Sequence, residues 1–156
     1  MALPINHRQL LIDDINTKLT ALKSITEGSE YRHKLVTVTD KPAPVDQVDP
    51  SLTPWACIVG GDGQSGNAPS NSDTDEMTVV IFGYVYEDLT RWSTLTAPKV
   101  CEEVLCDIEK AIDADLGHGG RAFGSTRERE LIHELSGKWS VFTLRENIRY
   151  NRRRTS

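Results

Sequence analysis

The stretch 77–86, MTVVIFGYVY, constrains the fold of this chain more than any other segment. Successive residues of a strand point to opposite faces of a sheet. This alternation divides its apolar side chains between two faces, with Val79, Ile81 and Val85 on one and Val80, Phe82, Tyr84 and Tyr86 on the other. Because both faces need cover, we expect a central strand with helices over one face and a neighbouring subunit over the other. Gly83 predicts a bulge or the close approach of another backbone.

Two segments have the apolar spacing of a helix. Residues 7–25 place isoleucine and leucine side chains three or four positions apart, and Gly28 follows as a stop signal. Residues 97–115 do the same, with Pro98 in the first turn and Gly117 beyond the end. We therefore expect two amphipathic helices.

The remaining pattern predicts four further strands. Short apolar or alternating runs stand at 35–38, 55–59, 128–135 and 139–150, and four prolines make 40–54 an extended connector. In the last run, alternate residues from Phe142 to Tyr150 are apolar except Glu146. The order of elements predicts an α+β fold. We expect a single domain over 1–150, with a mostly antiparallel or mixed sheet of about four to five strands flanked by two helices, and a basic C-terminal tail at 151–156.

Residues 60–76, GGDGQSGNAPSNSDTDE, contain no large apolar side chain. Such a segment cannot offset the entropy lost on ordering, so we expect a long flexible hairpin loop between two strands. Its acidic residues are candidate contacts for a partner or another subunit: Asp62, Asp73, Asp75 and Glu76.

Composition excludes several classes of protein. The chain of 156 residues carries a formal net charge of −5, which disfavours a non-specific nucleic-acid binder. No apolar run approaches the roughly 20 residues that span a bilayer, and residues 1–6 do not resemble a signal peptide. Three cysteines do not suggest a disulfide framework and favour a reducing compartment.

No motif with catalytic or metal-binding spacing stands out. Residues 60–66 are rich in glycine, but no Gly-Lys-Ser/Thr follows, and the acidic residues lack EF-hand spacing. Cys101 and Cys106 are five apart, so they point in different directions on a helix. We therefore predict no catalytic residues, no metal and no cofactor, and an enzyme is the least favoured class.

Opposite charges gather on two parts of the chain. The helix at 97–115 carries six carboxylates and two lysines. The C-terminal region is basic through Arg145, Arg149, Arg152, Arg153 and Arg154. Such complementary patches favour head-to-tail self-association, which we rank above nucleic-acid binding; a solvated tail is the simpler alternative. Arg149 and the three final arginines are candidate interface residues.

In their order, these elements resemble the tail terminator, or tail completion, proteins of long-tailed bacteriophages. The pieces that carry the resemblance are 107–112 (DIEKAI), 115–117 (DLG), 119–120 (GG) and the closing 148–150 (IRY). It extends over most of the chain, although each piece is short and degenerate.

The resemblance implies a small protomer that assembles as a hexameric ring on the head-proximal end of the tail tube. Such a ring stops tube polymerisation, offers a joining surface to the neck or head-completion protein and lets DNA pass through its lumen without specific binding. It implies a virion protein assembled in the host bacterial cytoplasm. The acidic helix face, with Glu102, Glu109 and Asp113, is the candidate lining of that lumen. A neck or head-completion protein and a small non-enzymatic adaptor are the alternatives.

Overall fold

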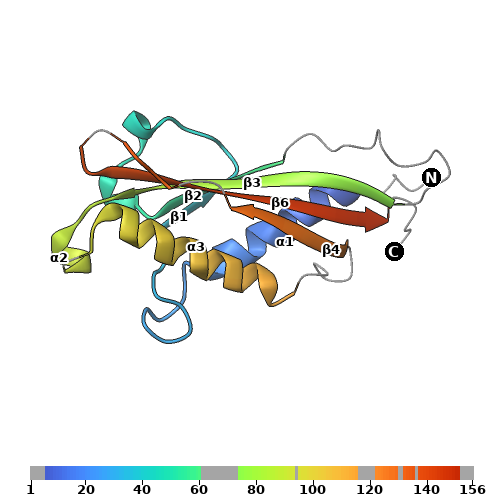
Figure 1. Cartoon of the computed structure of the whole chain (residues 1–156), viewed down its shortest axis with the longest axis horizontal. Coiled ribbons are helices and arrows are strands. Elements are labelled where there is room, and N and C mark those ends of the chain that lie inside the picture. Colours follow the sequence, from blue (N-terminus) through green and yellow to red (C-terminus); the bar gives the residue numbers. More distant parts are fainter. Residues whose placement is uncertain are drawn as a thin grey trace.

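Two antiparallel strands of 13 residues, β3 (Thr74–Tyr86) and β6 (Trp139–Asn151), form the centre of the sheet (Figure 1). The computed structural model describes residues 6–60, 74–93, 95–115, 122–129, 132–135 and 137–151. Every residue of β3 has a partner in β6, from Thr74 opposite Asn151 to Tyr86 opposite Trp139. The stretch 77–86 is therefore central, as its two apolar faces predict.

The sheet is mixed and belongs to one α+β domain. β1 (Thr37–Thr39) lies parallel to β2 (Trp55–Gly60), whereas the other pairings between the described strands are antiparallel. β5 pairs with the beginning of β6, outside the main path. The main order is β1 (Thr37–Thr39), β2 (Trp55–Gly60), β3, β6 and β4 (Ala122–Arg129), with β5 at His133–Glu134.

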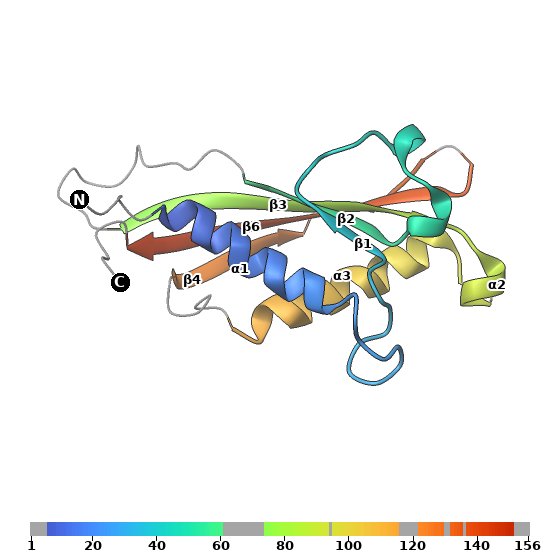
Figure 2. The same ribbon diagram turned by 180° about the vertical axis from the view of Figure 1, so that it is seen from behind.

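Helices α1 (His7–Ala21) and α3 (Ala97–Asp113) cover one face of the sheet, as Figures 1 and 2 show from opposite sides. Both end slightly earlier than the sequence predicts. A third helix, α2 (Leu89–Trp92), was not expected. The side chain of Asp88 caps it by accepting the backbone N–H groups of Thr90 and Arg91.

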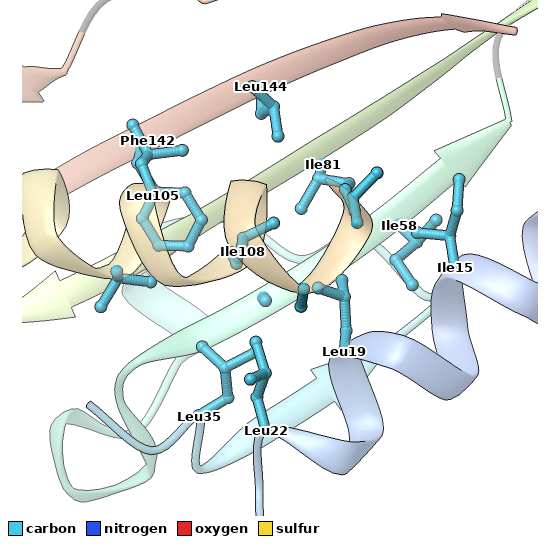
Figure 3. Packing of buried hydrophobic residues seen from close by; sticks show 14 of the residues in the cluster. Ile15, Leu19, Leu22, Leu35, Ile58, Ile81, Leu105, Ile108, Phe142 and Leu144 are labelled. Atoms are coloured by element: carbon cyan, nitrogen blue, oxygen red, sulfur yellow. The ribbon is translucent and has the colours of Figure 1, made fainter. Parts of the chain in front are cut away.

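The main core lies between these helices and the sheet (Figure 3). Val79, Ile81 and Val85 are fully buried there, so the predicted helix-covered face of β3 is confirmed. The same core takes its largest side chains from every layer, among them Ile15, Leu19, Leu105, Ile108, Phe142 and Leu144.

The opposite face of the sheet is covered only in part, and by the protein's own connector. Residues 40–54 contain two short 3-10 helices, η1 (Val45–Gln47) and η2 (Pro50–Leu52). The Tyr84 hydroxyl donates to the carbonyl of Ala43 at 3.0 Å. A second apolar cluster forms here and includes the partly exposed rings of Phe82, Tyr84 and Trp139, and the ring of Tyr86 contacts that of Trp139. We call these four aromatic residues the aromatic face.

Three sequence predictions need correction. The strand expected at 128–135 is replaced by two strands that both pair with β6: β4, which begins earlier at Ala122 and ends at Arg129, and the short β5 at His133–Glu134. The strand expected at 35–38 begins at Thr37. The loop expected at 60–76 is shorter, because Gly60 belongs to β2 and residues 74–76 pair with the end of β6. The rest of it, 61–73, lies outside the described residues.

Candidate functional site

An arginine on β4 connects three carboxylates from two neighbouring elements. The Nη2 atom of Arg127 lies 2.8 Å from Oδ1 of Asp113, and its Nη1 atom lies 3.7 Å from Oε2 of Glu109. Its Nε atom donates to Oε1 of Glu146 on β6. Arg127 therefore attaches the C-terminal half of α3 to the sheet.

The burial of Glu146 makes this cluster energetically important. Glu146 is fully buried on the helix-covered face, and its Oε2 atom has no hydrogen-bond partner among the described residues. Burial alone would lower the pKa of Arg127, but hydrogen bonds and charge interactions with Asp113 and Glu146 outweigh burial and raise that pKa. A guanidinium that stays charged is what a buried carboxylate requires.

The structure places the three candidate lumen residues differently. Glu102 is exposed on α3. Glu109 is partly buried and Asp113 is exposed, and both contact Arg127 of the same chain. The acidic helix face is thus much weaker than the sequence indicates, because an arginine distant in sequence neutralises part of it.

A second carboxylate of α3 holds the segment that follows α1. Asp107 is buried, and its Oδ2 atom accepts the backbone N–H of Arg32 at 3.0 Å and that of His33 at 2.9 Å. Glu103, one turn earlier, lies 2.9 Å from the Arg32 guanidinium and 3.2 Å from Nε2 of His33. These contacts attach residues 32–33 to the middle of α3.

We expect Asp107→Asn to lower the free energy of unfolding by about 1–3 kcal/mol, because a neutral amide accepts these backbone N–H groups more weakly than a carboxylate and places an NH2 group where Oδ1 accepts from Arg32. Urea unfolding measures this change, and hydrogen exchange should show lost protection at Arg32 and His33. Glu102→Gln, on the exposed side of the same helix, is the matched control and should change stability by less than about 0.5 kcal/mol. Equal values for the two variants would contradict the proposed anchoring.

The pairing of His33 with Glu103 is the arrangement closest to a catalytic pair among the described residues. The ring of His33 is buried and packs edge-on against Trp92, with centroids 6.2 Å apart. Its second nitrogen, Nδ1, is also buried and has no hydrogen-bond partner in the described part of the chain. A general base must lie within hydrogen-bonding reach of its substrate. Because Nδ1 is buried, the geometry fits a packing role better than general base catalysis.

Three of the predicted interface residues, Asp75, Glu76 and Arg149, are described, and they lie at the end of the sheet where β6 finishes. Glu76 on β3 lies opposite Arg149 on β6, and both are exposed. Asp75 accepts a hydrogen bond of 3.3 Å from the Tyr150 hydroxyl. Asp62, Asp73, Arg152, Arg153 and Arg154 lie outside the described residues.

A cavity of about 260 Å³ opens at the other end of the sheet. It lies between the beginning of α3 and the turn that joins β5 to β6, with Glu87 and Glu134 at its sides. Ser140 in its lining is 1% exposed, and its Oγ atom has no hydrogen-bond partner among the described residues. In the same described ranges, no three His, Cys, Asp or Glu side chains gather closely enough to hold a metal ion.

The three cysteines should differ sharply in reactivity. Cys106 is exposed, whereas Cys57 and Cys101 are buried. Burial, helped by the charge of Asp40, raises the pKa of Cys57 to about 11, and burial raises that of Cys101 to about 12. Only a thiolate attacks a disulfide reagent. Cys106 should therefore react promptly with such a reagent at pH 8, and Cys57 and Cys101 should react only in denaturant. A Cys106→Ser variant that retained a fast phase would contradict this assignment.

Comparison with known proteins identifies no relative: neither the known protein-family models nor the curated proteins contain a match to this chain. Within the described residues, no helix has the length and apolar character needed to cross a membrane.

Sequence reasoning missed Arg127 and the roles of Asp107 and Glu146, although two of these left a signal. Glu146 is a charged residue at an apolar position of the β6 alternation. Asp107 falls three residues after Val104 and four before Ala111, on the apolar side of α3. A charge at a core position indicates a buried polar contact. Arg127 carried no such signal, because its partners lie on other elements.

Proposed function

We propose that this protein is a structural component of a long-tailed phage virion, a tail terminator. In this role it forms a ring, hexameric by the resemblance, on the head-proximal end of the tail tube. The ring ends tube polymerisation and offers a joining surface to the neck or head-completion protein. Its assembly takes place in the host bacterial cytoplasm, and DNA passes through its lumen without specific binding.

The aromatic face is the observation that carries this proposal. Phe82, Tyr84, Tyr86 and Trp139 form a row of ring contacts, and the connector leaves all four partly exposed. Contiguous exposed apolar surface is typical of contact sites between proteins. An assembly subunit that buries this face against a neighbour would satisfy the two-sided apolar pattern of β3.

The ionisable clusters support the same class of function. Arg127 with Glu146 attaches α3 to the sheet, and Asp107 attaches residues 32–33 to α3. In both places the charged groups hold elements of the fold together. The resemblance in the short pieces quoted above then favours a phage tail terminator among structural proteins.

The test of this proposal is negative-stain imaging of the purified protein with tail tubes from a phage made without it. We expect rings in solution or a cap at one end of each tube, and a fixed tube length when the protein is present during assembly. A protein that ignores the tubes but binds the head connector would be a neck protein. Monomers that bind neither would favour an adaptor.

We expect Glu102→Lys to impair DNA passage if the exposed side of α3 lines the lumen, because a lysine would bind DNA phosphates. Infectivity should fall by at least about ten-fold, while tails of normal length still form. Glu109 and Asp113 are unsuitable for this test, since they contact Arg127. Glu30→Lys, with an exposed side chain outside α3, is the control. Unaltered infectivity of the Glu102 variant would contradict the lumen assignment.

A further inference from the structure

Acidic residues outnumber basic ones at the end of the molecule where β3 finishes and β6 begins. Figure 1 shows this end of the sheet. The backbone N–H of Glu87 donates to the carbonyl of Lys138, and the Arg91 guanidinium donates to the carbonyl of Thr53, so three segments meet there. The Tyr84 hydroxyl donates to the carbonyl of Ala43, which places the adjoining η1 segment, with Asp46, beside the same end of β3. We call this surface the acidic end; its carboxylates are Asp46, Asp49, Glu87, Asp88 and Glu134, against Arg91 and Lys138.

The acidic end also contains the cavity described above. Glu87, Glu134 and Lys138 line it, together with the buried Ser140, whose Oγ atom lacks a hydrogen-bond partner among the described residues. A buried hydroxyl without a partner is uncommon in folded proteins. A guanidinium group could donate to that oxygen and to a carboxylate at once, since it has five donors in a rigid plane.

The basic C-terminal region lies at the opposite end of the sheet. β6 begins at Trp139 beside the cavity and ends at Asn151, and Figure 1 shows it extended along the molecule. At about 3.3 Å per residue, its two ends are about 40 Å apart. Arg154 follows Asn151 by three residues, so it lies within about 11 Å of that end, and an extended side chain adds about two residues of reach. The arginines therefore cannot contact the acidic end of their own chain.

We propose that the acidic end binds the basic segment 149–154 of a second copy, so that subunits associate head to tail. This inference rests on the proposed function, which requires a ring, and it adds the surface by which neighbours recognise each other. Arg152, Arg153 or Arg154 of one copy enters the cavity between Glu87 and Glu134 of the next. Contacts between unlike surfaces repeat from subunit to subunit and close into a ring when the rotation permits.

This assignment replaces α3 as the acceptor of the arginines. On α3, Asp107 and Glu103 contact residues 32–33, and Glu109 and Asp113 contact Arg127. The cavity offers an exposed Glu134, and Glu87 is partly exposed, with its Oε1 atom accepting the backbone N–H of Ala97 at 3.3 Å. The main competitor is local pairing of the arginines with acids at their own end, such as Glu76 opposite Arg149.

The first experiment reverses charge on each side and measures self-association of the full chain by sedimentation velocity at low salt. Asp46→Lys with Glu134→Lys should weaken association by about ten-fold, and so should Arg152→Glu with Arg154→Glu. An equimolar mixture of the two variants should recover association, because each supplies the complementary surface. Asp13→Lys with Glu30→Lys changes the charge equally at other exposed positions and should have no effect.

The second experiment traps the contact by disulfide formation, so that weak association of the free protein is still detected. In a Cys106→Ser background, an Arg154→Cys chain is mixed with a Glu134→Cys chain under mild oxidation. We expect crosslinked dimers to form about ten-fold faster than with a Glu30→Cys partner. The difference should shrink in 1 M salt, where the Debye length is about 3 Å. Both cysteines in one chain should give a ladder of oligomers.

Equal crosslinking to Glu134→Cys and Glu30→Cys, or crosslinks within one chain, would overturn the inference. Tubes capped normally by the Asp46→Lys, Glu134→Lys variant would also overturn it, while leaving the terminator role intact. The terminator role itself fails if the unaltered protein neither forms rings nor caps tubes. Head-to-tail crosslinks without capping would support this contact and reject the tail assignment.

Discussion

Replacing Arg127 with methionine is expected to lower the free energy of unfolding by about 3–5 kcal/mol. The reason is the fully buried Glu146, whose Oε1 atom accepts from Nε of Arg127. Without the guanidinium, that buried carboxylate loses the cation with which it is paired, and Asp113 loses the partner at 2.8 Å that attaches the end of α3. Equilibrium urea unfolding, with helix and tryptophan signals recorded together, measures the loss.

A double variant separates charge from packing at this position. Arg127→Met with Glu146→Gln removes both buried charges, so it should recover at least half of the stability lost by Arg127→Met alone. Arg149→Met on exposed β6 surface is the matched control and should cost less than about 0.5 kcal/mol. A cost below about 1 kcal/mol for Arg127→Met, or no recovery in the double variant, would show that the cluster does not stabilise the fold.

Gly83→Ala is expected to be the other strongly destabilising substitution, with a cost of about 3 kcal/mol or more. Gly83 lies in the middle of β3 on the helix-covered face, and the ring of Phe142 packs over it from β6. A Cβ atom there would collide with the Trp55 carbonyl oxygen and would approach Cε1 of Phe142 to 2.7 Å. The carbonyl belongs to the backbone of β2, so it cannot move aside without disturbing the pairing of two strands.

Thermal unfolding of Gly83→Ala should show a large fall in Tm, of about ten degrees or more for a chain of this size. Gly28→Ala is the control, because nothing lies within 4 Å of the added atom although its φ of +84° carries some strain. The control should therefore cost only about 1 kcal/mol. Equal costs at the two glycines would mean that β2, β3 and Phe142 are not packed as tightly as the structure indicates.

The two largest effects come from one layer of the molecule. Gly83 lets Phe142 pack against β3, and Glu146 stands four residues further along the same face of β6. Both positions determine how closely α3 approaches the sheet. If the outer side of α3 faces DNA in an assembled ring, this layer supports the surface that carries Glu102.

Local pattern was a good guide wherever one element buries one face. The apolar spacing of α1 and α3, the alternation of β6 and the two-sided apolar character of β3 all express burial along a single element. Gly83 also carried a correct signal, since a glycine inside a strand often marks the close approach of a backbone. The α+β class followed from the order of these elements.

The local sequence pattern gave a wrong prediction where a segment or residue elsewhere in the chain determines the structure. β4 begins at Ala122, in a stretch that the sequence pattern assigned to the link before the strand, because β6 extends far enough to pair with it. Partners distant in sequence also explain why the prediction for the carboxylates of α3 was wrong. Its carboxylates appeared to form a solvated acidic face, but Asp107 binds the 32–33 backbone and Asp113 binds Arg127.

The sequence by itself therefore determined the class of fold, the central strand and the two helices that cover it, because periodicity reports the burial of each element directly. Only the tertiary structure decided which charges remain available at the surface. Whether a carboxylate faces solvent depends on which cation the folded chain brings within hydrogen-bonding distance, and that cation can be any number of residues away. The acidic end and its cavity became visible for the same reason, since three segments distant in sequence must meet to form them.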